Sequence, residues 1–317
     1  MPNWVSPKVS LPTKSPGIIV IESDDGNEGD HSRWFPFFRE LSQKYSQFYP
    51  YNLVKGTLNV NTGTIGDNTG ERRKMTVDNL LELQQYGWEI SSHGRHHVGL
   101  GAQNISTSVS AGATTIKIPR AVQIIEHQGK NHIGLYSWKI SEGGTSEVLN
   151  VIGGSVSLGE IQIATPLVNS YTTAAKVELT EESASQVLDG CKQDLASWGI
   201  DCESHAFTWH SGSYIDVNPN ALRWISERFT SGRGDFGILN PSSYDARKLN
   251  SYHDNITKTQ VNDLLTQTQQ NNHVFIIYGH GDHALYKLDI IEHVAREGIK
   301  RGMRFMTRKE LMQHLRA

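Results

Sequence analysis

Acidic and imidazole side chains follow three apolar segments of the chain, at the point where each segment ends. Asp24 and Asp25 come directly after the run IIVIES, His93 follows WEISS with His97 four residues later, and His280 follows HVFIIYG. Short apolar runs bounded by turn residues are typical of buried strands. We therefore expect three strands to deliver these five side chains at their ends.

The spacing of His93 and His97 indicates a metal site. Residues four apart share a face of a helical turn, and imidazole suits zinc and other first-row transition metals. A catalytic zinc ion usually takes three protein ligands and leaves a position open for water, so a third ligand must come from elsewhere. The alternative is a histidine-rich surface turn. His96 points to a different face, and we expect it either behind the ligands or in solvent.

The adjacent carboxylates offer that third ligand. In α/β folds the carboxyl ends of parallel strands form the rim of the active site. One of Asp24 and Asp25 could bind the metal, and the other could act as a general base. His280 could protonate a leaving amine or alcohol. The alternatives are an ordinary Asp-Asp-Gly turn and a histidine-rich loop.

Strands and helices alternate in the segments that must position these residues. The helix predicted for MTVDNLLELQQYG begins after Thr76 as its N-cap and stops at Gly87. A second run, TEESASQVLDGCKQDLASWG, begins after Thr180, and a last one, TRKELMQHLR, opens with Thr307 and Glu310 at capping-box spacing. This alternation predicts a parallel sheet covered by helices. The apolar face of the second run consists of Ala184, Val187, Leu188, Cys191, Leu195 and Trp198.

Residues 105–179 have a different texture. They contain glycines, threonines and short alternating segments such as TTIKIP and EVLNVIGGSVSLGEIQIA, with no convincing helix. Short strands with glycine-containing turns predict an antiparallel β domain. We therefore expect a discontinuous α/β domain over residues 1–104 and 180–317, interrupted by an all-β domain over residues 105–179. Without that insert the chain is close to the roughly 250 residues of an α/β barrel, although a large open sheet would also fit.

Composition excludes several classes of protein. The chain has 317 residues, 37% of them hydrophobic and 20% charged, with a net charge of −3. No basic excess suggests nucleic acid, and no apolar run approaches the roughly 20 residues of a membrane-spanning helix. The segment MPNWVSPKVSLPTKSPG lacks the apolar core of a signal peptide. Cys191 and Cys202 are too few for a disulfide framework, which favours two reduced, buried thiols.

The motifs resemble, in order and spacing, those of the polysaccharide deacetylases, also called NodB-homology or carbohydrate esterase family 4 enzymes. That family carries Thr-Phe-Asp-Asp-Gly where residues 22–26 read ESDDG, and His-(Ser/Thr)-x-x-His where residues 93–97 read HGRHH. Its late Leu-x-His corresponds to YGH at residues 278–280, and the closing GIKRGMRFMTRKELM is also similar. The resemblance spans about residues 1–104 and 180–317.

This resemblance implies a fold and an activity. The fold would be a distorted (β/α)7-type barrel, with Zn²⁺ or another divalent transition metal held by Asp25, His93 and His97. Asp24 would be the catalytic base and His280 the catalytic acid in removing an acetyl group from a glycan. An N-acetylglucosamine-type polysaccharide or peptidoglycan is the expected substrate. The alternatives are an O-acetyl esterase acting on xylan-like glycans and a glycan-binding module with weakened catalysis.

One family motif is altered. Where the family carries Arg-x-Pro-Tyr or a variant of it, this chain reads FTWHSGSY, without the arginine and the proline. We expect Trp209, His210 and Tyr214 from this stretch to line the substrate site. For the acid that tunes His280 we favour Asp235 over Asp245, and the alternative is that Asp235 is merely a turn residue.

Residues 105–179 also resemble, in their turn rhythm, small β modules of phage tail and baseplate proteins. This resemblance implies an extracellular or virion-associated enzyme that acts on a host surface glycan, with other phage structural proteins as partners through the insert. His132, Tyr136 and Trp138 could stack on a glycan, but aromatic residues on a short strand are more often core, and we favour the core interpretation.

Overall fold

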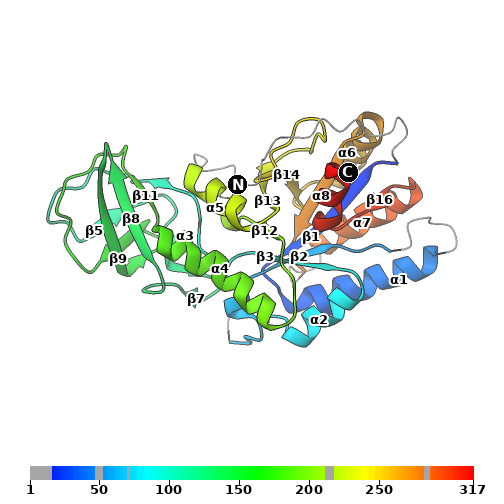
Figure 1. Cartoon of the computed structure of the whole chain (residues 1–317), viewed down its shortest axis with the longest axis horizontal. Coiled ribbons are helices and arrows are strands. Elements are labelled where there is room, and N and C mark those ends of the chain that lie inside the picture. The colour runs from blue at the N-terminus through cyan, green and yellow to red at the C-terminus, as the bar shows by residue number, and fades with distance from the viewer. Residues whose placement is uncertain (1–15, 47–52, 70–71, 211–217, 282–285) are drawn as a thin grey trace.

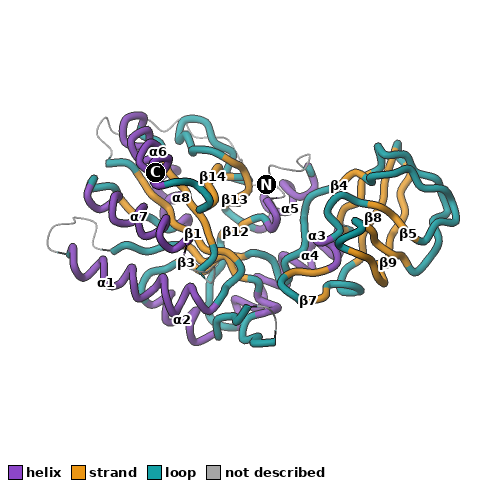
Figure 2. Tube along the Cα trace, turned by 180° about the vertical axis from the view of Figure 1, so that it is seen from behind, coloured by secondary structure: helices purple, strands orange, loops and turns teal. Residues whose placement is uncertain are grey.

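The computed structural model describes residues 16–46, 53–69, 72–210, 218–281 and 286–317. Two lobes follow one another along the long axis of the molecule (Figure 1). One lobe contains strands from both ends of the chain, and the other contains strands from its middle. Seen from behind, the same two groups of strands stay apart, with α3 and α4 near the junction (Figure 2).

Seven parallel strands form a closed barrel in the first lobe. Their order is β15-β14-β13-β12-β3-β2-β1, and β15 pairs with β1 to close the ring. In that closing pair Ile18 lies opposite Val274 and Ser23 opposite Gly279. The predicted (β/α)7-type barrel is therefore confirmed. The strands are β1 Ile18–Asp24, β2 Thr57–Val60, β3 Glu89–Ser92, β12 Ser204–Ala206, β13 Ser231–Phe236, β14 Leu249–His253 and β15 Val274–Gly279.

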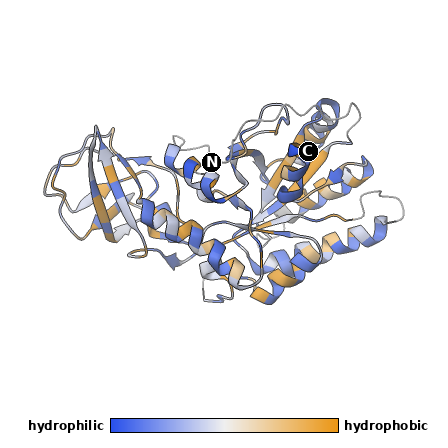
Figure 3. Ribbon diagram, in the orientation of Figure 1, coloured by the Kyte–Doolittle hydropathy of each residue, from blue (hydrophilic) through white to orange (hydrophobic). Residues whose placement is uncertain are grey.

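An eighth strand extends the sheet at β1. β16 (Arg304–Phe305) pairs with the first two residues of β1, whereas β2 pairs with its last three. Every residue of β1 and of β15 is buried. Parallel strands covered on both faces read as continuous apolar runs, which is why IIVIES and VFIIYG have that character. Figure 3 shows this contrast between apolar central strands and helices of mixed character.

Helices cover the outside of the barrel (Figure 1). Their apolar faces pack on the strands, as the helical periodicity of the sequence predicts. A π-helical turn at Asp30–Trp34 leads directly into α1. The helices are α1 Phe35–Tyr45, α2 Val77–Gln85, α4 Glu181–Ser197, α5 Pro219–Arg228, α6 Lys258–Asn271, α7 Tyr286–Lys300 and α8 Arg308–Arg316.

The predicted helix ends are confirmed. The Thr76 hydroxyl accepts a hydrogen bond from the Asn79 amide and begins α2, and Gly87 follows that helix at a φ of +85°. Thr307 and Glu310 form the capping box of α8. On α4 the predicted apolar residues are buried except the last, Trp198, which is the C-cap and only half-buried.

The second lobe contains a six-stranded sheet in which every pair is antiparallel, with the order β4-β11-β8-β9-β10-β5. A one-turn helix, α3 (Val122–Ile125), interrupts these strands, and four residues are too few to produce a helical pattern in the sequence. The division of the chain into two domains stays a prediction. The strands are β4 Gln103–Asn104, β5 Thr115–Lys117, β8 Ser137–Glu142, β9 Thr145–Ser155, β10 Glu160–Ile163 and β11 Lys176–Leu179.

One continuous cluster contains buried apolar side chains from both sheets, and a second, smaller cluster contains other barrel residues, among them Ile18, Val20, Val274 and Ile276. Tyr136 and Trp138 of the second lobe are part of the larger cluster, and His132 is buried as well, so the core interpretation of these residues is confirmed. Cys191 and Cys202 are buried free thiols, as expected. Among the described residues, no helix combines the length and the apolar character needed to cross a bilayer.

Candidate active site

The predicted site residues lie at the carboxyl ends of three barrel strands. Asp24 is the last residue of β1 and Asp25 follows it. His93 follows β3 directly, and His280 follows β15 directly. Because all barrel strands are parallel, these ends meet at one rim. The rim therefore brings together segments that are about 70 and about 250 residues apart in sequence.

Asp25 is the centre of this cluster. Its Oδ1 lies 3.5 Å from His93 Nε2 and 3.4 Å from His97 Nε2, and its Oδ2 lies 3.6 Å from His280 Nε2. The Asp25 carboxylate is fully buried, and His93 and His97 are nearly so. One carboxylate thus faces three of the predicted imidazoles, each through its Nε2 atom.

The backbone at this point is strained. Asp25 has a φ of 77° and Gly26 a φ of 65°. Aspartate adopts the left-handed region more readily than most residues, but still at a cost. Strain of this kind persists where the surrounding structure requires it, often at functional sites. Here it turns the Asp25 side chain away from the line of β1 and toward the imidazoles.

The donor set fits a divalent transition metal. Around a tetrahedral zinc ion with ligand distances of about 2.0–2.1 Å, donor atoms lie about 3.3–3.4 Å apart, close to the 3.4 and 3.5 Å between Asp25 Oδ1 and the two Nε2 atoms. Within the part of the chain that the structure describes, buried Asp25 Oδ1 has no hydrogen-bond donor. His93 Nδ1 lies 2.9 Å from the Ala206 carbonyl. That contact assigns the ring proton to Nδ1 and leaves Nε2 free to bind a metal.

The protonation states also suit metal binding. Burial lowers the pKa of His93, and it lowers the pKa of His97 well below its usual range, so both rings are neutral at pH 7. Burial alone would raise the pKa of Asp25, but the His97 imidazole and a hydrogen bond from His127 outweigh it and hold this pKa well below the usual range. An anionic carboxylate with neutral imidazoles is the form that ligates metal.

Asp24 has different partners. The Arg233 Nη2 donates to both of its carboxylate oxygens, at 2.5 and 2.6 Å, and Asn59 Nδ2 donates to Oδ1 at 2.9 Å. Burial would raise the pKa of Asp24, but the Arg233 guanidinium outweighs it and holds this pKa well below the usual range. Asp24 is therefore ionised and fixed in orientation beside the cluster.

Arg233 was missed by the sequence analysis. It lies on β13, is nearly fully buried, and covers the ring of Tyr278 at 3.9 Å. The chain thus places an arginine from β13 against Asp24, although FTWHSGSY contains none. A signal existed in SGRGDFG, where a charged residue stands between small residues in a segment short enough to be a buried strand.

A polar layer lies beneath the rim inside the barrel. Glu22 Oε2 is 2.9 Å from Arg233 Nε and 3.2 Å from Arg308 Nη1. Arg308 Nη2 also donates to Asn59 Oδ1 at 2.6 Å and to Ser91 Oγ at 2.5 Å. Because Asn59 and Arg233 both contact Asp24, this layer supports the orientation of the carboxylate above it.

His280 is flanked by two glycines that leave no room for a side chain. A Cβ on Gly279 would come 2.4 Å from Asp254 Oδ2, and a Cβ on Gly281 would come 2.3 Å from Asp30 Oδ1. The Asp30 carboxylate accepts hydrogen bonds from Ser23 Oγ and from the Gly281 amide, at 2.5 and 2.9 Å. Asp30 thereby ties the end of β1 to the segment that carries His280.

Asp235 does not reach His280. Its carboxylate pairs with Lys248 Nζ at 3.1 Å and caps the Phe236 amide at 2.8 Å, on the half-exposed end of β13. The preference for this residue is therefore corrected. The buried acid beside Gly279 is Asp254, which follows β14. Periodicity could not indicate Asp254, because LNSYH before it contains no apolar run that marks a buried strand.

The FTWHSGSY stretch is only partly described. Trp209 lies at the site, because its Nε1 donates to the His97 carbonyl at 3.1 Å and its ring stands edge-on to His97 at 4.8 Å. It has a φ of 57°, which is unusual for a bulky residue. His210 closes a short helical turn, η3 (Thr208–His210), and Tyr214 lies outside the described residues. The substrate-lining role of all three stays a prediction.

Residues of the second lobe also reach the site. A hairpin of β6 (Glu126–His127) and β7 (Lys130–Asn131) places two side chains next to Asp25. His127 Nε2 lies 3.2 Å from Asp25 Oδ2, and Gln128 Nε2 donates to the same oxygen at 2.5 Å. Neither residue could be predicted from the sequence, because EHQGKNH contains no pattern that ties it to residue 25.

His96 is half-buried, and its Nδ1 lies 2.6 Å from the Tyr136 hydroxyl. Its ring is therefore held against the second lobe rather than directed at Asp25. Of the two placements expected for His96, the one behind the ligands describes it better than free solvent.

Comparison with known proteins gives a limited result. No family model matches the chain, and no curated protein matches it. One similar solved structure is the Xyl-CE4 domain of a multidomain xylanase from the hindgut metagenome of Trinervitermes trinervoides, at 11% identity and a TM-score of 0.47, covering 94% of this chain and 90% of that one.

Two further solved structures are similar over most of the chain. A family 4 acetyl xylan esterase from Clostridium thermocellum, in complex with a cobalt ion, has 10% identity and a TM-score of 0.45, covering 94% of this chain and 91% of that one. A Mycobacterium smegmatis protein described as a polysaccharide deacetylase has 10% identity and a TM-score of 0.49, covering 98% and 93%. Because these identities and TM-scores are low, the barrel is assigned from the strand order of this chain and not from the similar structures. The family that the sequence motifs resemble is nevertheless represented among the solved structures to which this chain is similar.

Proposed function

We propose that this chain is a metal-dependent hydrolase that removes acetyl groups from a glycan. One observation carries the proposal: a single buried carboxylate, Asp25, faces the Nε2 atoms of His93, His97 and His280 at 3.4–3.6 Å. Asp24 stands beside it, ionised and held by Arg233. A ligand set, a separate carboxylate and a separate imidazole are the groups that metal-assisted hydrolysis requires.

The residues divide the chemistry between them. A divalent ion such as zinc, held by Asp25, His93 and His97, would supply Lewis acidity that polarises a carbonyl and brings the pKa of water toward about 7. Asp24 would accept a proton from the attacking water. Its lowered pKa keeps it ionised but makes it a weak base, so this transfer depends on that acidified water.

His280 would complete the reaction. Its Nε2 lies 3.6 Å from Asp25 Oδ2, and its side chain is 19% exposed, so it can reach a substrate that enters from solvent. As the carbon–nitrogen or carbon–oxygen bond breaks, protonated His280 would donate its proton to the departing atom. The products would be acetate and a free amine or hydroxyl group. Asp254 and Asp30 pack closely against Gly279 and Gly281, on either side of the residue that carries this ring.

The glycan substrate rests on the motif resemblance at residues 22–26, 93–97 and 278–280. An N-acetylglucosamine polymer or peptidoglycan is the proposed substrate, and an O-acetylated xylan is the alternative within the same chemistry. The same donor set and the same proton transfers serve an amide and an ester, so only the leaving atom differs.

The test is acetate release from chitooligosaccharide, a peptidoglycan fragment and acetylated xylan, by protein that has been freed of metal and then reloaded with zinc. We expect zinc-dependent release of acetate from at least one of these substrates. Glycan binding without acetate release would favour the binding-module alternative. Release at an equal rate with and without a chelator would contradict the metal-dependent mechanism.

An extracellular or virion-associated location is part of the same proposal. Its support is the turn rhythm of residues 105–179, which resembles phage tail modules, and other phage structural proteins would then be partners of that segment. Mass spectrometry of purified phage particles that encode the chain is the direct measurement. Absence of the chain from such particles would contradict this location.

A further inference from the structure

The β6–β7 hairpin approaches the site through an unusual turn. Its two central residues, Gln128 and Gly129, have φ values of 50° and 75°. Two-residue hairpin turns with both φ values positive prefer asparagine or aspartate followed by glycine. Glutamine carries a Cβ, which makes this conformation unfavourable for it. The contacts of its side chain must therefore compensate for the backbone.

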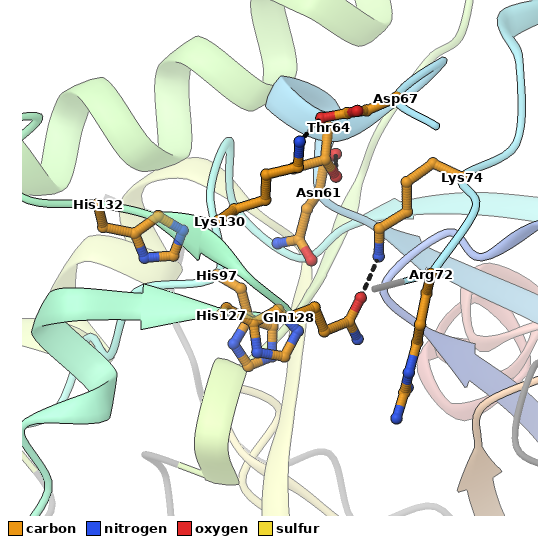
Figure 4. A pocket seen from close by; sticks show the side chains of 10 residues that line it. All are labelled: Asn61, Thr64, Asp67, Arg72, Lys74, His97, His127, Gln128, Lys130 and His132. Atoms are coloured by element: carbon orange, nitrogen blue, oxygen red, sulfur yellow. Dashed lines mark hydrogen bonds and ion pairs between the residues drawn. The ribbon is translucent and has the colours of Figure 1, made fainter. Parts of the chain in front are cut away.

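Those contacts fasten the turn to the loop after β1. Gln128 donates to Asp25 Oδ2 at 2.5 Å and accepts from Lys74 Nζ at 2.7 Å. Lys74 in turn donates to the Asp25 carbonyl at 3.2 Å and to Asn27 Oδ1 at 2.7 Å. Figure 4 shows Gln128 extending toward Lys74 while the His127 ring lies against His97. Gln128 thus anchors the tip of the turn, and the His127 ring makes a separate contact between the hairpin and Asp25.

His127 has the position of a metal ligand. Its ring stacks on the His97 ring, with centroids 3.6 Å apart and an angle of 12° between the planes. The Trp209 ring lies edge-on to both imidazoles. The ligand atoms of Asp25, His97 and His127 all lie within 4.8 Å of one another. The His127 side chain is only 16% exposed. A half-buried imidazole with its Nε2 directed at the metal-binding carboxylate has the chemistry of a ligand.

We propose that His127 is a further ligand of the metal ion that Asp25, His93 and His97 hold. The proposal rests on the function proposed above and adds a residue to it. Asp25 follows barrel strand β1, and His93 and His97 follow β3, whereas His127 is the last residue of β6, in the middle of the chain. The ion would therefore join the hairpin to the barrel, and the identity of residue 127 would set both the affinity for metal and the order of the hairpin.

A cobalt titration of metal-free protein tests this assignment, with visible absorption and calorimetry as the readouts. The variants are His127→Gln, which keeps an amide donor for Asp25 but loses the imidazole, and His314→Gln as a control histidine on α8. We expect the wild type and H314Q to bind one cobalt ion with the same spectrum. For H127Q we expect a changed ligand-field spectrum and an affinity lower by more than about 100-fold, the most that loss of a hydrogen-bonded neighbour of a ligand usually costs.

The outcomes separate this inference from the proposed function. If the wild type binds no cobalt at the site, the metal-dependent function fails. If the wild type binds and H127Q gives the same spectrum, His127 only donates a hydrogen bond to Asp25, and this inference alone is overturned. Equal circular dichroism of the metal-free proteins checks the fold of the variant.

A second measurement needs no variant. Lys130 follows the turn, so trypsin cleavage after Lys130 reports on the order of the hairpin. Zinc is expected to slow this cleavage in the wild type, relative to cleavage elsewhere in the chain. Equal rates with and without zinc, in protein shown to bind it, would contradict the ligand role of His127.

Discussion

At the scale of single residues, Asp24 and Asp25 have the same side chain but different surroundings. Asp24 accepts hydrogen bonds from Arg233 and Asn59, whereas Asp25 faces four imidazoles. Surroundings of this kind assign different roles to neighbouring carboxylates. The cation beside Asp24 offsets its charge, while the imidazoles leave Asp25 as the anion that a metal ion can neutralise.

Asp24→Asn separates binding from chemistry. The amide keeps the size of the side chain but cannot accept a proton, so we expect acetate release to fall by about 10²–10⁴-fold, the usual contribution of a general base. Zinc content should not change, because Asp24 is not a proposed ligand. Metal analysis and acetate release on the same sample provide the check. Asp25→Asn is the matched variant and should lose both zinc binding and acetate release. Near-normal turnover of D24N would refute the role of Asp24.

Arg233→Met changes the pH dependence of activity. Without the guanidinium, burial dominates and the pKa of Asp24 rises, so the base becomes protonated at higher pH than in the wild type. The acid limb of the kcat/KM profile should therefore move to higher pH. Arg247→Met is the control, because Arg247 pairs with Asp245 at the surface instead. An acid limb at the same pH in wild type and R233M would contradict this account of the ion pair.

The sequence predicted only part of this site. Asp24, Asp25, His93 and His280 could be placed because each stands directly after a strand that its own apolar run reveals. Arg233 and Gln128 contact these residues across 209 and 103 positions of sequence. No local pattern encodes such a contact. It depends on strand order and on the path of the hairpin, which periodicity does not contain.

At the scale of elements, α8 contributes more than a cover for the barrel. Its first residue, Arg308, is fully buried and reaches Glu22, Asn59 and Ser91 inside the ring. The capping box at Thr307 fixes the start of the helix, and so fixes where this guanidinium enters. The cap could be predicted from the sequence but the buried charge could not, because TRKELM is typical of the exposed first turn of a surface helix.

Arg308→Met is expected to destabilise the protein by about 3 kcal/mol, at the lower end of what loss of one partner from a buried ion pair costs. The lower end applies because Glu22 keeps its contact with Arg233. Urea denaturation of the metal-free proteins measures this change. A double variant combines Arg308→Met with Glu22→Gln. Its loss in free energy of unfolding should be smaller than the sum of the losses in the two single variants. Additive changes would show that the two side chains are not coupled.

At the scale of the whole molecule, buried histidines make stability depend on pH. Burial lowers the pKa of His132 to about 3, and the nearby His96 and His127 rings add to this shift. The unfolded chain takes up a proton near pH 6.5, which the folded chain does not accept until much lower pH. Folding is therefore favoured above about pH 6.5, and the free energy of unfolding falls as pH falls below it.

For one such histidine, the free energy of unfolding changes by about 1.4 kcal/mol per pH unit where it depends most steeply on pH. We expect His132→Gln to remove about that much of the slope between roughly pH 6 and pH 5, a window above the pKa values of unfolded carboxylates. Urea denaturation in the presence of a chelator measures it. Identical slopes for wild type and variant would show that His132 is protonated in the folded state as well.

The shared hydrophobic cluster limits how the lobes can be recombined. Buried side chains of the antiparallel sheet and of the barrel form one cluster, and β8 is tied to α4 because the Ser137 amide donates to Ser183 Oγ at 2.8 Å. Cutting at residues 104 and 180 would bare apolar surface on both pieces. The middle segment therefore cannot be moved into another protein without exposing its apolar surface. A chimera that keeps the metal chemistry must contain both lobes together.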